Sequence, residues 1–150
     1  MSRVIYGAII GLALIVALEH HPPGPGVMIG TLLATAVAVG LAELYSEVVG
    51  TEARTHRRVG RAGIRRMLDD VGAVALGIAF PCVFFILAAA GSIDVETAFT
   101  IAKWSGLVLI GFYGFAAGRL SGAGVAASLL QAVVVGTIGG ALIAFKALIH

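Results

Sequence analysis

The sequence is poor in charge, in aromatic side chains and in cysteine. Only 12% of its 150 residues are Asp, Glu, Lys or Arg, which is about half the share in a typical soluble domain. The single cysteine, Cys82, excludes an internal disulfide and a cysteine-rich metal site. Aromatic residues make up 7% and are not interleaved with basic ones, so the net charge of +2 does not predict a nucleic-acid partner.

The motifs of soluble enzymes are also missing. The chain has no phosphate-binding loop, no His-x-x-Glu-His set, and no Ser/His/Asp or Cys/His arrangement in a suitable context. We therefore predict a protein that is not an enzyme and that requires no resident cofactor.

Apolar residues dominate what is present. They make up 59% of the chain, and the mean hydropathy is +1.04, which predicts an all-α integral membrane protein. Residues 1–150 are predicted to form a single membrane domain. Its five transmembrane spans are expected at about 4–18, 26–49, 71–90, 95–119 and 125–148. The first could be a signal peptide, because Arg3 precedes it, but no small-x-small cleavage site follows, so we interpret it as a retained span.

Basic residues fall mainly on one side of these predicted spans. That side carries eight arginines, whereas the other carries Lys103 and Lys146. Because cytoplasmic loops are enriched in Lys and Arg, we predict a cytoplasmic N-terminus and a C-terminus on the outside. The predicted location is the plasma (inner) membrane of a bacterium, with the lipid bilayer as the main partner.

A basic cytoplasmic loop is predicted at residues 50–70. Its segment Glu52–Asp70 has the pattern of a short amphipathic helix, whose arginines would contact anionic headgroups. These membrane-surface residues are Arg54, Arg57, Arg58, Arg61, Arg65 and Arg66. Asp69 and Asp70 are predicted to begin the next helix, where they either favour its N-terminus or line a cytoplasmic vestibule for cations.

Two carboxylates interrupt the end of the second span. Glu43 and Glu47 are four residues apart and therefore share one face of a helix. Carboxylates in a span are costly and normally face a cavity, a partner or an ion path, and their oxygens suit divalent cations. One interpretation is cation coordination or proton exchange on a transport path. The alternative is a salt bridge to Arg119 or to an arginine of the loop, or simple placement at the interface.

A second group of candidate ligands lies at the outer end of the first span. Glu19, His20 and His21 carry carboxylate and imidazole groups, which bind transition metals. Adjacent residues on a regular helix cannot all converge on one ion, so solvated turn residues are the alternative. Glu19 and His20 remain candidates for an outer metal contact.

Other residues have expected structural roles. Pro81 is predicted to kink the third span, and Asp94 is predicted to cap the fourth helix. Cys82, inside an apolar run, is expected to be a packed thiol. Thr31 and Thr35 either line a path or bond back to their own helix.

Glycines recur at the small-xxx-small spacing that lets helices approach closely in lipid. The pairs are Gly7/Gly11, Gly114/Gly118 and Gly136/Gly140. The spacing fits close packing within one subunit and also fits a dimer interface, and a pore would be easier to build from two copies.

Three short motifs follow one another along the predicted spans. The second span ends in residues 39–46 (VGLAELYS), the third contains residues 77–81 (GIAFP), and the fourth ends in residues 117–122 (AGRLSG). A glycine-rich last helix follows at 133–148. In this order the motifs resemble the five-span vacuolar iron transporter family, whose second span ends in a motif close to Ser-Met-x-x-Gly-Glu-Tyr-x-Ser. The likeness covers about residues 26–148.

The resemblance implies a homodimer and a cation/proton antiport that moves a divalent metal, iron or manganese, out of the cytoplasm. It implies that Glu43 lies on the transport path, with Glu47 beside it. Further ligands would come from Asp69, Asp70, backbone carbonyls or a second subunit. The family's acidic first-span motif is absent, since residues 5–7 (IYG) contain no acid. Two hypotheses follow: a cation transporter or channel, and a non-transporting membrane scaffold or accessory subunit on the same fold whose protein partner the sequence does not name.

Overall fold

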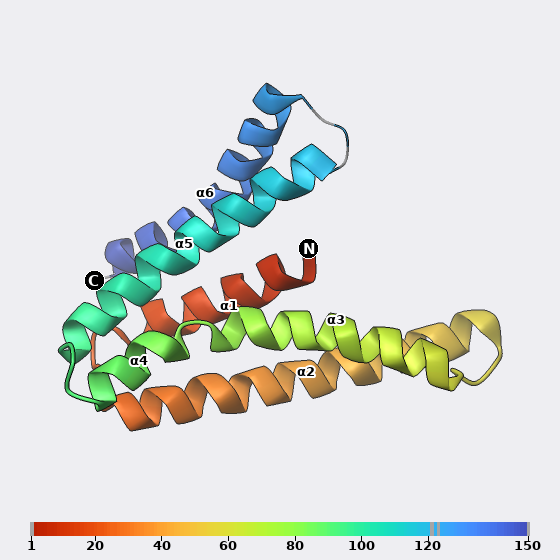
Figure 1. The fold of residues 1–150 in the computed structure, drawn as a ribbon, viewed down its shortest axis with the longest axis horizontal. Coiled ribbons are helices and arrows are strands. Elements are labelled where there is room, and N and C mark those ends of the chain that lie inside the picture. The colour runs from red at the N-terminus through yellow and green to blue at the C-terminus, as the bar shows by residue number, and fades with distance from the viewer. Residues whose placement is uncertain (1, 121, 123, 150) are drawn as a thin grey trace.

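The computed structural model describes residues 2–120, 122 and 124–149. Within these residues the chain is all-α, without strands. The helices are α1 (Ser2–Leu18), α2 (Pro25–Thr55), α3 (Arg61–Ala79), α4 (Cys82–Ala89), α5 (Val95–Leu120) and α6 (Val125–Ile149). Figure 1 shows these helices running back and forth along the molecule. We call the end where α1 begins the Arg3 end, and the end where it finishes the Glu19 end.

Several of these helices suit a membrane. Both α2 and α5 are long and apolar enough to cross one, and α3 with α4 adds a third span if the bent pair is counted as one. α1, with 17 residues, is a shorter apolar helix. Large apolar side chains lie on the outside, including Leu41, Val108 and Phe112, which are 63%, 69% and 65% exposed. These features indicate a membrane protein, whereas five spans and their orientation stay predictions.

The prediction of one amphipathic helix over residues 52–70 is wrong. α2 continues to Thr55, α3 begins at Arg61, and residues 56–60 alone turn the chain. α2 therefore has 31 residues and is about 46 Å long, which exceeds the roughly 30 Å thickness of a hydrocarbon core. In Figure 1 the ends of α2 and α3 form a hairpin that extends beyond the other helices.

The turn of this hairpin depends on a few polar contacts. His56 ends α2 in the left-handed backbone region, with φ of 51°. The carboxylate of Glu52 accepts a hydrogen bond at 3.1 Å from the backbone N–H of Val59, across the turn. Because α3 begins before this polar segment ends, Asp69 and Asp70 lie inside the helix, beyond its first turn. The prediction that they begin the helix is therefore wrong.

Other local predictions are confirmed. The chain bends by 45° between α3 and α4, at Pro81, which lacks the N–H that would continue the helix. Asp94 caps α5, because its carboxylate accepts bonds of 2.8 Å from both the N–H and the hydroxyl of Thr97. These bonds lower the pKa of Asp94. The hydroxyls of Thr31 and Thr35 donate to carbonyl oxygens four residues earlier, at 2.8 Å.

α1 is the central helix of the bundle. It packs against α3, α5 and α6, while α2 packs against α3 and α4. The backbones of α1 and α3 touch: a Cβ built on Gly7 would lie 2.1 Å from the carbonyl oxygen of Val74. A Cβ on Gly77 would lie 2.6 Å from the carbonyl oxygen of Val4. Close helix packing within one subunit is therefore confirmed for the Gly7/Gly11 pair.

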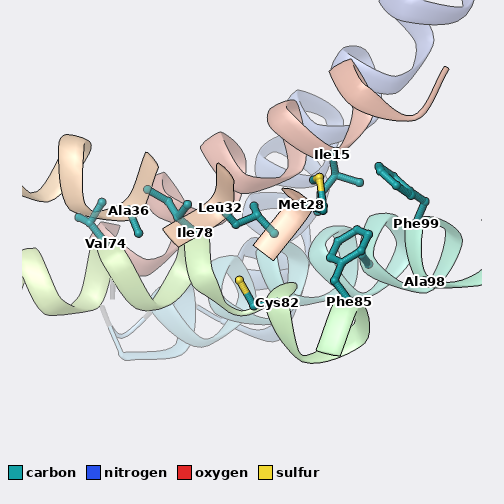
Figure 2. Packing of buried hydrophobic residues seen from close by; sticks show 11 residues of the cluster. Ile15, Met28, Leu32, Ala36, Val74, Ile78, Cys82, Phe85, Ala98 and Phe99 are labelled. Atoms are coloured by element: carbon teal, nitrogen blue, oxygen red, sulfur yellow. The ribbon is translucent and has the colours of Figure 1, made fainter. Parts of the chain in front are cut away.

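A buried apolar cluster joins α1, α2, α3, α4 and α5 (Figure 2). It includes Ile15, near the end of α1, and Met28, near the start of α2, and both are fully buried. The rings of Phe85 and Phe99 meet edge to face, with centroids 4.9 Å apart, an arrangement that aromatic pairs favour. Cys82 is buried in this cluster, as predicted. The cluster fixes the helices at the Glu19 end.

Candidate functional site

Glu43 and Glu47 both bind one arginine from α1. The Nη1 of Arg3 donates to Oε2 of Glu43 at 2.8 Å, and its Nη2 donates to Oε2 of Glu47 at 3.1 Å. The two carboxylates lie one helical turn apart on α2 and so present adjacent oxygens to the planar guanidinium. We call these three residues the Arg3 cluster. The side chains of Arg3, Glu43 and Glu47 are 33%, 23% and 27% exposed, so the cluster is partly exposed at the surface of the helix bundle.

The ion pair expected as an alternative to transport exists, but with a different partner. Arg3 binds both carboxylates, where Arg119 or an arginine of the loop was predicted. The sequence carried a signal for this partner, since Arg3 was placed on the same side as Glu43 by the distribution of basic residues. In the folded chain the first turn of α1, which carries Arg3, lies beside the part of α2 that carries Glu43 and Glu47.

The charge of the Arg3 cluster is not balanced. Two carboxylates share one guanidinium, and the charge of Asp70, on α3, also acts on Arg3. A cation that reached this position would gain attraction from the carboxylates but would have to compete with a tethered guanidinium. The arrangement is therefore a negatively charged site with an internal cation already bound.

An open pocket lies beside Glu43. Its volume is about 310 Å³, and it is lined by Tyr6, Val39, Ala42, Glu43 and Ser46. A water molecule occupies about 30 Å³ in the liquid, so the pocket is large enough for a hydrated ion. The pocket leaves Glu43 open to the outside of the helix bundle.

The acids predicted to complete a metal site are not gathered around Glu43. Asp69 and Asp70 are exposed on α3. In the part of the chain that the structure describes, no three His, Cys, Asp or Glu residues lie close enough together to hold a metal ion. A metal site built from Glu43, Glu47 and these two aspartates would need atoms from outside one chain.

A second ion pair lies at the other end of α1. Nζ of Lys103, on α5, donates to Oε1 of Glu19 at 2.5 Å, with the lysine side chain 17% exposed. Glu19 also lines a pocket of about 210 Å³ with Glu96 and Thr100. Glu19 thus holds an ammonium group where a metal contact with His20 was predicted, and His20 itself is exposed. Sequence reasoning missed Lys103, although it lay on the same predicted side as Glu19.

α1 is therefore held by ion pairs at both ends. From residue 3 to residue 19 the helix rises about 24 Å at 1.5 Å per residue. At the Arg3 end it is tied to α2, and at the Glu19 end to α5. Between these pairs its contacts are glycine and apolar side chains.

The predicted membrane-surface arginines are all exposed on the hairpin of α2 and α3. They are Arg54, Arg57, Arg58, Arg61, Arg65 and Arg66. Their exposure agrees with contact to solvent or headgroups, although they occupy two helix ends and a turn where one helix was predicted.

Comparisons with known proteins give no relative. No family model matches this chain, and no curated protein or solved structure is significantly similar to it. The resemblance to vacuolar iron transporters therefore rests on its sequence motifs.

Proposed function

We propose that this chain is a five-span membrane transporter or channel for a divalent cation, with its Arg3 end in the cytoplasm. Glu43 and Glu47 form its entry site, and Arg3 is the cation that occupies this site between transport events. The observation that carries the proposal is the convergence of two carboxylates on one cation beside an open pocket. Iron or manganese as the ion, proton coupling and export follow from the resemblance to vacuolar iron transporters.

An exchange of cations explains why the guanidinium of Arg3 lies against Glu43 and Glu47. A divalent cation entering through the pocket displaces the guanidinium and binds oxygens of Glu43 and Glu47, which are hard ligands suited to it. When the cation leaves, Arg3 returns and prevents repulsion between the two carboxylates. The beginning of α1 moves in this exchange, and the bend at Pro81 permits adjustment of α3 and α4.

The resemblance to vacuolar iron transporters also implies a homodimer, and α6 offers a surface for one. A Cβ built on Gly136 or Gly140 would meet no atom within 4 Å. This small-xxx-small pair on α6 therefore has room for a helix of a second copy.

The second candidate function is a non-transporting scaffold or accessory subunit. The observation that favours it is that Arg3 binds both carboxylates, which satisfies their charge without any ion. In this case the Arg3 cluster serves to hold α1 against α2, and its loss affects stability alone.

Cation flux into proteoliposomes separates the two candidates. We expect uptake of Mn²⁺ or Fe²⁺ by the wild type and loss of at least about tenfold in Glu43→Gln, equivalent to about 1.4 kcal/mol. In Arg3→Gln the competing cation is gone, so half-saturation should move to lower cation concentration. Lys103→Gln is the matched control, because it removes a cation from the other end of α1.

The transport role predicts opposite effects: Glu43→Gln lowers the flux, whereas Arg3→Gln lowers the cation concentration needed for half-saturation. Equal flux in the wild type and Glu43→Gln would remove Glu43 from the path. If no cation from a panel is transported, while Arg3→Gln and Glu43→Gln lower the melting temperature by similar amounts, the accessory role stands.

A further inference from the structure

An apolar groove runs between α2 and α3. Its volume is about 660 Å³. It is lined by Leu33, Ala36, Val37, Gly40, Leu41, Leu44, Leu68, Val71, Gly72, Ala75, Leu76 and Ala79. All of these side chains are hydrocarbon or absent, so the groove offers no polar partner along its length. It is separate from the Arg3 cluster and its pocket.

Small residues keep the groove open. A Cβ built on Gly72 would meet no atom within 4 Å, and Gly72 itself is exposed. Leu33 and Leu76, by contrast, are 48% and 62% exposed and form raised walls. The space follows α2 from Leu33 to Leu44 and α3 from Leu68 to Ala79. It is therefore elongated and apolar, as an extended hydrocarbon chain is.

Arginines of α3 continue the groove at its Arg3 end, where the nearest acid on α2, Glu47, is already paired with Arg3. The groove finishes at Leu44 on α2 and Leu68 on α3. Helical register places Arg65 and Arg61, which are three and seven residues before Leu68, on the same face of α3. Both arginines are exposed. By the same register, Asp70 lies on the opposite face of α3.

We infer that the groove binds one acyl chain of an anionic phospholipid, whose phosphate is bound by Arg61 and Arg65. The two halves of the site match the two halves of such a lipid: a hydrocarbon channel and, at its end, a pair of guanidinium groups. Basic sites between helices at the cytoplasmic surface recognise lipid headgroups in this way. Arginine suits phosphate because its planar fork donates two parallel hydrogen bonds.

A second copy of this chain is a poorer occupant. A twofold interface places the same patch of both subunits together. With both copies in the same membrane orientation, Arg61 and Arg65 of each would lie at the same level and would repel their counterparts. An anionic lipid neutralises these charges instead.

Native mass spectrometry of the purified chain in detergent tests the inference. Phosphatidylglycerol and phosphatidylcholine with identical acyl chains are added separately, and glycerol phosphate supplies the headgroup without a chain. We expect retention of phosphatidylglycerol over phosphatidylcholine, and no retention of glycerol phosphate. Arg61→Gln/Arg65→Gln should weaken phosphatidylglycerol binding about 25-fold, since each basic residue near the surface contributes about fivefold.

Two matched controls show whether the effect belongs to the groove. Arg57→Gln/Arg58→Gln removes the same charge from the tip of the hairpin and should leave lipid binding unchanged. Gly72→Leu fills the groove and should abolish retention. Gly30→Leu, at an exposed glycine of α2 with equal space around it, should not.

Three results would overturn the inference. Equal binding of the two lipids would exclude recognition of the phosphate charge. Equal losses of phosphatidylglycerol binding in the two double-arginine variants would mean that the net charge of the hairpin, and not a specific site, attracts the lipid. Conversion of a dimer to a monomer by Gly72→Leu, with unchanged lipid binding, would assign the groove to a second copy. Helical circular dichroism of every variant confirms that the chain is folded.

Discussion

The two faces of α3 use small residues for opposite purposes. On the face toward α1, Gly7, Gly11 and Gly77 bring two backbones into contact. On the face toward α2, Gly72 and Ala75 line an open groove. Glycine thus removes a side chain to allow contact on one face and to leave space on the other. Spacing along the sequence alone does not distinguish these roles.

The difference has an energetic consequence. Without a hydrophobic driving force between helices in lipid, close backbone packing is a main source of their association. The face toward α1 should therefore carry much of the stability, whereas the face toward α2 should tolerate added volume. A series of glycine to alanine substitutions, each adding one methyl group, measures this contrast. Cys82 is buried, so its labelling by a thiol-reactive dye during heating reports unfolding.

Gly7→Ala should have the largest effect. The new Cβ would lie 2.1 Å from the carbonyl oxygen of Val74 and 2.9 Å from its carbonyl carbon. Backbone atoms cannot rotate away, so α1 and α3 must separate. We expect a loss of about 3 kcal/mol or more, the upper range for overpacking, seen as earlier labelling of Cys82. A melting temperature equal to that of the wild type would contradict the close contact of the two helices.

Gly11→Ala should have a smaller effect on the same face. Its Cβ would lie 3.2 Å from the Cα of Ile78 and 3.3 Å from the carbonyl oxygen of that residue. A shift of a few tenths of an ångström relieves these contacts. We expect a loss of about 1–2 kcal/mol in the same labelling assay. A loss as large as that of Gly7→Ala would mean that the contact is equally tight along α1.

Gly40→Ala should cost less, because the neighbour is a side chain. The added Cβ would lie 3.0 Å from Cγ1 of Val71, at the junction of α2 and α3. Val71 can move toward the groove, so we expect a loss below about 1 kcal/mol. A larger loss, measured by dye labelling, would show that the groove wall is rigid.

Gly72→Ala should be neutral or stabilising. No atom lies within 4 Å of the new methyl group, and alanine favours a helix over glycine by up to about 1 kcal/mol. The melting temperature should stay the same or rise. A fall would mean that the groove is closed by contacts that this structure lacks, and the contrast between the two faces of α3 would fail.

Much of the fold could be predicted from the sequence. Long apolar runs indicate where the helices lie. Their ends are marked by single residues, since Pro81 interrupts a helix and Asp94 caps one. The hairpin was missed because residues 52–70 were taken to form one separate amphipathic helix, although residues 50–55 continue the helix of the preceding span. Polarity reports whether a segment faces water, and a helix that leaves the membrane can remain a helix.

The acidic residues of the candidate site could be predicted from the sequence, whereas the ion pairs that they form with Arg3 could not. Glu43 and Glu47 stood out because carboxylates are rare in apolar helices, and their spacing gave a shared face. Their partner Arg3 lies far away in the sequence, so its selection over other arginines depends on how α1 packs against its neighbours. The Glu19–Lys103 pair was missed for the same reason, since it joins two helices whose adjacency no local pattern reveals.

If α1 is a span, as the proposed five-span arrangement requires, the ion pairs at its two ends mark the thickness of membrane that suits it. The apolar part of α1 between them rises about 24 Å, whereas an average hydrocarbon core is about 30 Å thick. Such hydrophobic mismatch is relieved when the lipid around a short helix thins, at a cost that grows with each ångström. In the proposed five-span arrangement, we therefore expect the chain to partition into the thinner regions of a membrane.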